Sequence, residues 1–112
     1  MSDVLPYSHN AEISIRKLRE YSLNPAHDDG KHKARVFKSA LGVGQSEALW
    51  LRAEILRTLP HAGAVRQIED KWGVRYAVDI EITRGAKSAK VRSTWIIVRG
   101  DTRPQLTSCW VI

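Results

Sequence analysis

The feature that most constrains this chain is a regular alternation of apolar and polar residues over positions 74–83. A period of two is what a β-strand with one buried and one exposed face requires. The chain therefore contains a sheet with one covered face, and other parts of the sequence must supply the cover. The apolar positions of the run are Val74, Tyr76, Val78, Ile80 and Ile82.

Three further segments predict strands. Residues 89–98 alternate again, and the Gly-containing loop 84–88 joins them to the first run as a hairpin. Shorter runs over 64–70 and 105–112 predict a strand on either side. Trp95 is expected in the core because it shares a strand face with Val91 and Ile97.

In the first half of the chain, apolar residues recur every three to four positions, the spacing typical of helices. Helices are predicted over 15–22, 31–41 and 46–59, with Ser46 as the N-cap of the third. Residues 1–12 are expected to be a flexible or extended segment of the same single domain, 1–112. The predicted fold class is α+β, with N-terminal helices packed on one face of a four-stranded antiparallel meander sheet.

Charge indicates the kind of partner. The chain has 18 Lys and Arg against 12 Asp and Glu, a formal net charge of +6. Much of the excess lies in two segments, 31–38 and 84–103, and such clusters suit a polyanion such as nucleic acid. A solvated basic surface or a protein partner is the alternative. The predicted nucleic-acid-binding residues are Lys31, Arg35, Lys87, Lys90, Arg99 and Arg103.

Several functional classes are not supported. The longest apolar run is about four residues, far below the length of a membrane span, so no membrane association is expected. The N-terminus lacks a secretory signal pattern, and the single Cys109 cannot form an internal disulfide, so a cytoplasmic protein is expected. Cys109 has no adjacent base in sequence, which disfavours a nucleophilic role. The Gly42–Gly44 segment does not complete a phosphate-binding loop, and no cofactor is predicted.

His27 is the first catalytic candidate. It lies between Pro25 and a basic helix start that contains Lys33, and histidine changes its charge near neutral pH. Together with Asp28, Asp29 and His32 it could instead bind a metal ion. Because these residues match no zinc or calcium spacing, no metal is predicted.

Arg92 has two interpretations that sequence leaves open. Its guanidinium could hold a phosphate in a bidentate fork. It could equally form a cross-strand ion pair with Asp79 or Glu81, which alternate onto one face of the neighbouring strand. Asp79 and Glu81 could also bind a metal ion, as in a metal-dependent nuclease, but two carboxylates on a charged strand face are only a weak indication of such a site.

A family resemblance covers residues 15–107. Lys17 to His27, then Gly30, Lys33 to Arg35 and Phe37, resemble the opening motif of a small uncharacterised bacterial domain family, and residues 73–79, 91–97 and 104–107 resemble its later blocks in the same order. That family occurs alone or at the C-termini of polymorphic toxins and phage-associated proteins. It is similar to the barnase-EndoU-colicin-RelE-like group of metal-independent ribonucleases.

The resemblance implies an endoribonuclease toxin that cleaves RNA by 2′-hydroxyl attack without metal. We expect His27 to transfer a proton, Lys33 and Arg92 to stabilise the phosphate, and Thr107 to donate its hydroxyl to a phosphate oxygen. RNA and a cognate antitoxin or immunity protein are the implied partners. The alternative is a non-catalytic module that binds nucleic acid or protein, including a phage-associated one.

Overall fold

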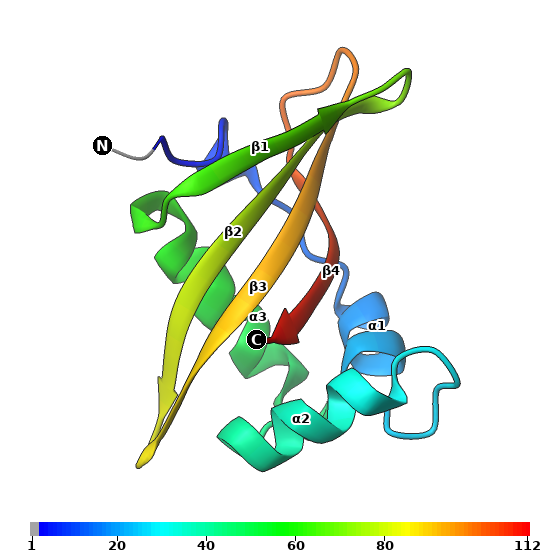
Figure 1. Cartoon of the computed structure of the whole chain (residues 1–112), viewed down its shortest axis with the longest axis vertical. Helices are drawn as coiled ribbons and strands as arrows, with labels where there is room; N and C mark the ends of the chain where they lie inside the picture. The colour runs from blue at the N-terminus through cyan, green and yellow to red at the C-terminus, as the bar shows by residue number, and fades with distance from the viewer. Residues whose placement is uncertain (1–2) are drawn as a thin grey trace.

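A computed structural model describes residues 3–112, and its centre is a four-stranded antiparallel sheet in the order β1-β2-β3-β4 (Figure 1). This is the predicted meander. The strands are β1 (Ala64–Glu69), β2 (Gly73–Arg84), β3 (Lys87–Val98) and β4 (Gln105–Val111). The fold class is α+β, as the sequence predicts.

The β2–β3 hairpin is tighter than the sequence predicts. Arg84 pairs with Lys87, so only Gly85 and Ala86 form the turn in place of the expected loop 84–88. Gly85 has φ 61°, a left-handed conformation that glycine adopts without steric cost and that two-residue hairpin turns use. In the resulting register of β2 and β3, Asp79 pairs with Arg92.

The helices agree with prediction in number, and the first two also agree in their bounds; only the third differs at its ends. The first is α1 (Ile15–Lys17) continued by a wider π-helical turn, η2 (Leu18–Ser22), and the second is α2 (Lys31–Leu41). The third, α3 (Ala48–Thr58), starts after a 3-10 turn, η3 (Gln45–Glu47). Two further 3-10 turns are η1 (Ser8–Asn10) and η4 (Leu59–His61).

The predicted N-cap at Ser46 is wrong. The N-cap of the 3-10 turn is Gly44, whose backbone N–H donates to Glu47 Oε1 at 2.8 Å. Ser46 lies within the turn and makes no capping bond. The capping contact therefore comes from the Glu47 carboxylate and the N–H of Gly44, not from a Ser46 hydroxyl and the N–H groups that follow it.

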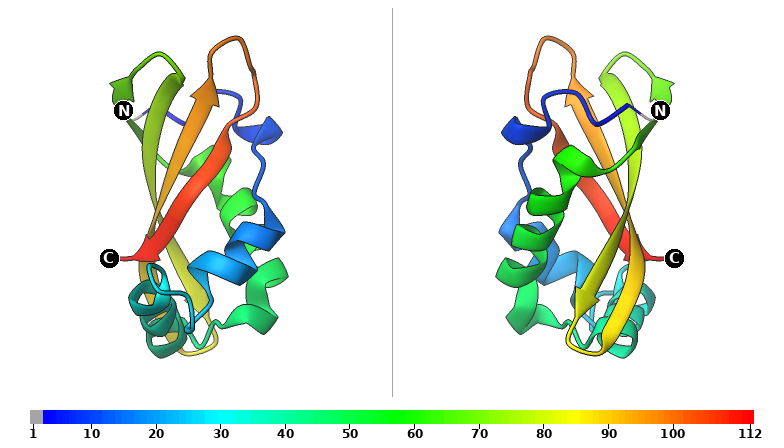
Figure 2. Two further views of the ribbon diagram at one scale, coloured as in Figure 1. Left: turned by 90° about the vertical axis from the view of Figure 1, so that its right-hand side faces the viewer. Right: turned by 90° about the vertical axis from the view of Figure 1, so that its left-hand side faces the viewer.

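Helices α1 and α3 cover one face of the sheet, while α2 lies across the end formed by the β2–β3 turn and the C-terminal half of β4 (Figure 2). The core between these layers includes Phe37, Leu51, Val78 and Trp95, each with no exposed surface. Trp95 is thus a core residue, as predicted. The opposite face, here called the open face, carries Asp79, Glu81 and Thr83, although small Ala77 on this face is buried.

Residues 3–12, here called the N-terminal strap, are held to both edges of the sheet. The N–H of Ala64 at the start of β1 donates to Asp3 O at 2.6 Å, and Leu106 N–H of β4 donates to Glu12 O at 3.0 Å. Leu5 is 1% exposed. Over residues 3–12 the segment predicted as flexible or extended bonds to the sheet through these contacts, and residues 1–2 lie outside the described part of the chain. Within residues 3–112 no helix has the length and apolar character of a membrane span.

Candidate functional site

His27 lies in the loop between η2 and α2, and close packing fixes this loop. A Cβ at Gly30 would collide with the carbonyl oxygen of Tyr21, so only glycine lets the loop approach η2 so closely. The Tyr21 and His27 rings lie 4.4 Å apart between centroids. The loop thus presents His27 beside an exposed aromatic ring.

The backbone of the same loop determines the tautomer of His27. Nδ1 accepts the N–H groups of Asp29 at 3.1 Å and Gly30 at 3.2 Å. Because an acceptor nitrogen carries no proton in the neutral ring, this hydrogen-bond pattern places the proton on Nε2. Neutral His27 is therefore a hydrogen-bond donor at Nε2, and protonating Nδ1 would break both bonds to the loop.

Tyr21 connects His27 with Thr107. A hollow of about 490 Å³ is lined by His27, Tyr21 and Lys17, and a second hollow of about 260 Å³ between η2 and β4 is lined by Tyr21, Lys17 and Thr107. Thr107 is an extra residue at a bulge in β4, and its Oγ1 lies 2.7 Å from Thr94 Oγ1 on β3. Two candidates separated by 80 positions in sequence thus face adjoining hollows.

Lys33 and Arg92 are each neighbours of Trp110. Lys33 Nζ lies 4.4 Å from the centre of the Trp110 ring, a cation–π contact between α2 and β4. Trp110 is the β4 partner of Arg92 in the sheet register. The sequence did not single out Trp110, although an aromatic residue in an edge strand near a basic helix is a signal that could have found it.

Arg92 forms the cross-strand ion pair that was one of its two predicted interpretations. Its Nε and Nη2 donate to the two carboxylate oxygens of Asp79 at 2.8 and 3.0 Å. Hydrogen bonding from Arg92 lowers the pKa of the Asp79 carboxyl below its usual value, and Asp79 in turn raises the pKa of the guanidinium. Glu81, the other predicted partner, instead accepts a hydrogen bond from Ser88 Oγ at 3.2 Å.

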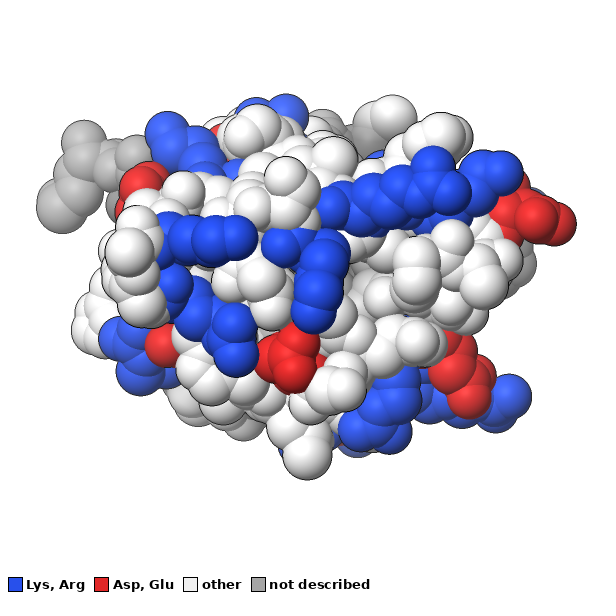
Figure 3. Space-filling view, turned by 90° about the horizontal axis from the view of Figure 1, so that it is seen from below, with Lys and Arg blue, Asp and Glu red and all other residues white. Residues whose placement is uncertain are grey.

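The six predicted nucleic-acid-binding residues do not share one surface. Lys31 and Arg35 are on α2, Lys87 is beside the β2–β3 turn, and Lys90 lies on the same strand face as Arg92; Figure 3 looks onto the end that α2 and this turn form. Arg99 and Arg103 are in the β3–β4 connection at the opposite end (Figure 1). There Arg99 donates to Asp70 O, and Arg103 pairs with Asp101 and Glu12.

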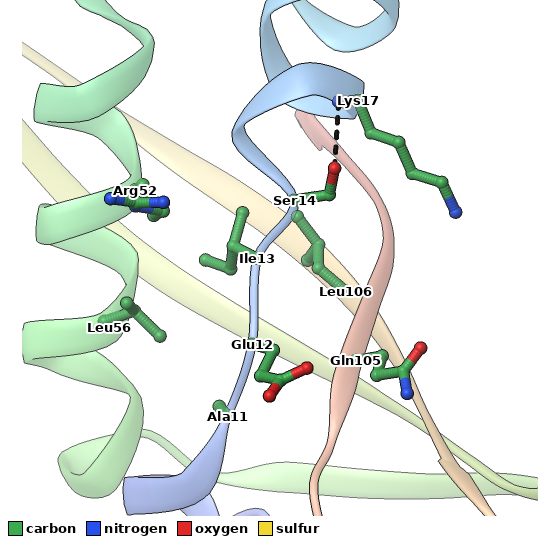
Figure 4. Close-up of a pocket in the computed structure, with 9 residues that line it drawn as sticks. All are labelled: Ala11, Glu12, Ile13, Ser14, Lys17, Arg52, Leu56, Gln105 and Leu106. Atoms are coloured by element: carbon green, nitrogen blue, oxygen red, sulfur yellow. Dashed lines mark hydrogen bonds between the residues drawn. The ribbon is translucent and has the colours of Figure 1, made fainter.

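A further hollow of about 450 Å³ adjoins the site. Figure 4 shows Arg52 and Leu56 of α3 on one side of the N-terminal strap and Gln105 and Leu106 of β4 on the other. Ser14 is shared with the two hollows near Tyr21, and its Oγ accepts the backbone N–H of Lys17 at 3.2 Å. None of the four predicted catalytic residues lines this third hollow.

Cys109 is 1% exposed, and burial raises the pKa of its thiol to about 12. It is therefore protonated and inaccessible, in line with the absence of a predicted nucleophilic role. Over residues 3–112 no three His, Cys, Asp or Glu side chains converge as metal ligands do.

The fold and these surfaces define a small α+β domain with aromatic and cationic side chains gathered along the C-terminal half of β4. The chain belongs to the family described as "Domain of unknown function (DUF6883)", whose model matches residues 4–112. No curated protein and no solved structure matches the chain.

Proposed function

We propose that the protein is an endoribonuclease that cleaves RNA without a metal ion. Two groupings support the proposal: Tyr21 adjoins His27 and lines a hollow with Thr107, and Trp110 contacts Lys33 and is the strand partner of Arg92. Cations, a hydroxyl and an imidazole drawn from separate elements are the groups that phosphoryl transfer needs.

The proposed chemistry is attack of the RNA 2′-hydroxyl on the adjacent phosphorus with departure of the 5′-oxygen. Lys33 and Arg92 neutralise the charge that develops on the phosphoryl oxygens, and Thr107 donates a hydrogen bond to one of them. We assign proton transfer to His27 at Nε2, the ring nitrogen that the loop leaves free. With the ring proton on Nδ1, Nε2 accepts the proton of the 2′-hydroxyl and then gives it to the departing 5′-oxygen. A change of charge on the ring requires Nδ1 to give up its two backbone donors, so loop movement is part of the proposal.

The test incubates total RNA and tRNA with the protein in the presence of a chelator. We expect the parent chain to cleave and His27→Ala to lose about 10² to 10⁴ of the rate, the usual contribution of one proton-transfer group. His61→Ala is the matched control, because His61 is an exposed histidine in η4. Cleavage that requires a divalent metal ion, or that survives His27→Ala, would contradict the proposal.

His27→Asn separates proton transfer from hydrogen bonding. Asparagine can accept the Asp29 and Gly30 N–H groups through Oδ1 and donate through Nδ2, but it cannot transfer a proton. We expect it to preserve folding and to be as inactive as His27→Ala. If His27→Asn keeps its activity, His27 acts only as a hydrogen-bond donor and does not transfer a proton.

The toxin assignment rests on the family resemblance and implies a cytoplasmic RNA target and a neutralising partner. Induced expression in bacteria tests it. We expect the parent chain to arrest growth and His27→Ala to permit it at equal protein level. Unimpeded growth with the active enzyme present would remove the toxin assignment and leave the nuclease proposal to its own test.

A non-catalytic RNA-binding module is the second candidate function. It is favoured by two observations: protein groups already occupy Nδ1 of His27 and two donors of the Arg92 fork. In that case RNA is retained in a gel-shift assay and recovered intact. The chelator experiment therefore distinguishes the two candidates directly.

A further inference from the structure

The unpaired cations of the molecule concentrate at one end. Within residues 3–112 every arginine that forms an ion pair lies outside α2 and the β2–β3 turn, and none of the cations on these two elements has an acidic partner within bonding distance. We call the outward-facing group the basic end. It consists of Lys31, Arg35, Lys38, Arg84 and Lys87.

Two direct contacts join its two halves. Lys87 Nζ donates to Ser39 O at 3.2 Å, and Arg84 Nη1 donates to Gly42 O at 3.1 Å. These carbonyls belong to the last turn of α2 and its cap, where positive charge is favourable. The turn is thereby held against α2, and cations about 50 positions apart in sequence become neighbours. Figure 3 shows Lys and Arg side chains spread over this end, with acidic groups between and beside them.

The cations on α2 form a stripe. Lys31, Arg35 and Lys38 are four and three positions apart, so they project from one side of the helix over about 10 Å of its axis. Lys33 projects from the other flank, toward Trp110. One flank of helix α2 therefore carries Lys33 toward the candidate site, and the other flank carries the stripe of cations that belongs to the basic end.

We infer that the basic end binds the phosphates of a single-stranded RNA that runs from the candidate site across α2, an inference that rests on the proposed function. A strand bound beside Lys33 can continue over α2 and meet a regular row of cations, none of which forms an ion pair in the described part of the chain. Glu47 lines the same hollow as Arg35 and Lys38, but its carboxylate forms no ion pair with them and accepts the Gly44 N–H. Neutralising phosphates in this way releases counterions and supplies affinity independent of sequence.

The aromatic residues favour a single strand over a duplex. Tyr21 is 37% exposed beside His27, and Trp110 is half-buried under Lys33. Unpaired bases can stack on such rings, whereas the bases of a duplex are already stacked on each other. An acidic protein is the less suitable partner because, apart from Tyr21 at the candidate site, the exposed aromatic side chains of residues 3–112 are Tyr7 and Trp72, which are on neither α2 nor the β2–β3 turn.

The test measures binding, so that it does not depend on cleavage. The probe is a fluorescent single strand of about 12 nucleotides with 2′-O-methyl groups, which block the attacking hydroxyl; its length falls within the site sizes of single-strand-binding domains. We expect Arg35→Glu/Lys38→Glu to weaken binding by about tenfold or more and to reduce the slope of log affinity against log salt concentration by about 1.4, the value for two lost phosphate contacts.

The matched control is Arg66→Glu/Lys71→Glu. It makes the same change in net charge with two exposed cations on β1 and the β1–β2 connection, away from α2 and the β2–β3 turn and outside the predicted binding residues. We expect less than about a twofold loss of affinity from this control. If Arg35→Glu/Lys38→Glu does not fold, Arg35→Gln/Lys38→Gln replaces it in the same comparison.

Equal weakening by the two double variants, or none by either, would overturn the basic end as an RNA surface. A duplex of the same sequence that binds as tightly as the single strand would overturn the single-strand assignment. Loss of cleavage in the chelator experiment with the binding pattern intact would instead contradict the proposed catalysis alone. The two proposals therefore fail in distinguishable ways.

Discussion

Buried Ser93 links the sheet to its largest core side chain. Its Oγ–H donates to Val78 O at 2.8 Å and its oxygen accepts Trp95 Nε1–H at 2.9 Å, and Ser93 itself has no exposed surface. Together these bonds satisfy the polar group that a tryptophan brings into an apolar core.

We expect Ser93→Ala to lower the free energy of unfolding by about 1–3 kcal/mol, because it leaves a buried donor and a buried acceptor unpaired. Urea denaturation measures this. Ser46→Ala is the control, since Ser46 is exposed and makes no capping bond, and it should change stability by no more than about 0.5 kcal/mol. A comparable loss in both variants would mean that the hydroxyl bonds of Ser93 add nothing.

Individual residues also mark the limit of prediction from sequence. The alternation placed Trp95 in the core and offered Asp79 as a partner of Arg92, because both follow from a period of two. The tautomer of His27 and the contact of Lys33 with Trp110 could not be predicted. They depend on how a loop folds back on η2 and where α2 meets β4, which no local pattern encodes.

At the scale of elements, the two faces of β2 differ in what covers them. Val78 has no exposed surface beneath the helices, while Ala77 is 9% exposed on the open face. We expect Val78→Asp to cost about 3 kcal/mol in unfolding free energy, because it buries an unpaired charge. Ala77→Asp should cost less, since its carboxylate can reach solvent and the hollow that Arg92 lines. If thermal unfolding shows the same loss of stability in both variants, neither face of β2 tolerates a charged side chain.

Sequence patterns predicted the elements well and their junctions less well. Residues 15–22 and 31–41 are helical as expected. The start of α3 differed from the prediction because the Glu47 carboxylate, not the Ser46 hydroxyl, makes the capping hydrogen bond. The β2–β3 turn is shorter than predicted because Gly85 adopts a left-handed conformation. The position of α2 across the end of the sheet follows from tertiary packing of Phe37 and Leu41, so the pattern alone could not predict it.

At the scale of the whole molecule, the ionisation of the Cys109 thiol depends on whether the domain is folded. Burial raises the pKa of its thiol to about 12, above its value in an unfolded chain. The folded state therefore keeps a proton that the unfolded state loses above about pH 9, so stability falls as pH rises through this range. We expect Cys109→Ala to show a smaller loss of stability than the parent chain between about pH 8 and about pH 11.

Thiol labelling of the parent chain provides a second measurement of the same property. A disulfide reagent should react with Cys109 only as fast as the core opens, and urea should accelerate the reaction in step with unfolding. Fast labelling of the native protein at neutral pH would show that β4 detaches locally from η2.

The N-terminal strap makes this domain mechanically asymmetric. Asp3 and Glu12 bond to opposite edge strands, β1 and β4. A pulling force applied at Asp3 is therefore borne first by its bond to Ala64 and by the anchored Leu5, and only then by the strands themselves. The strap would peel before the sheet yields, and its release would expose the backbone of both edges at once.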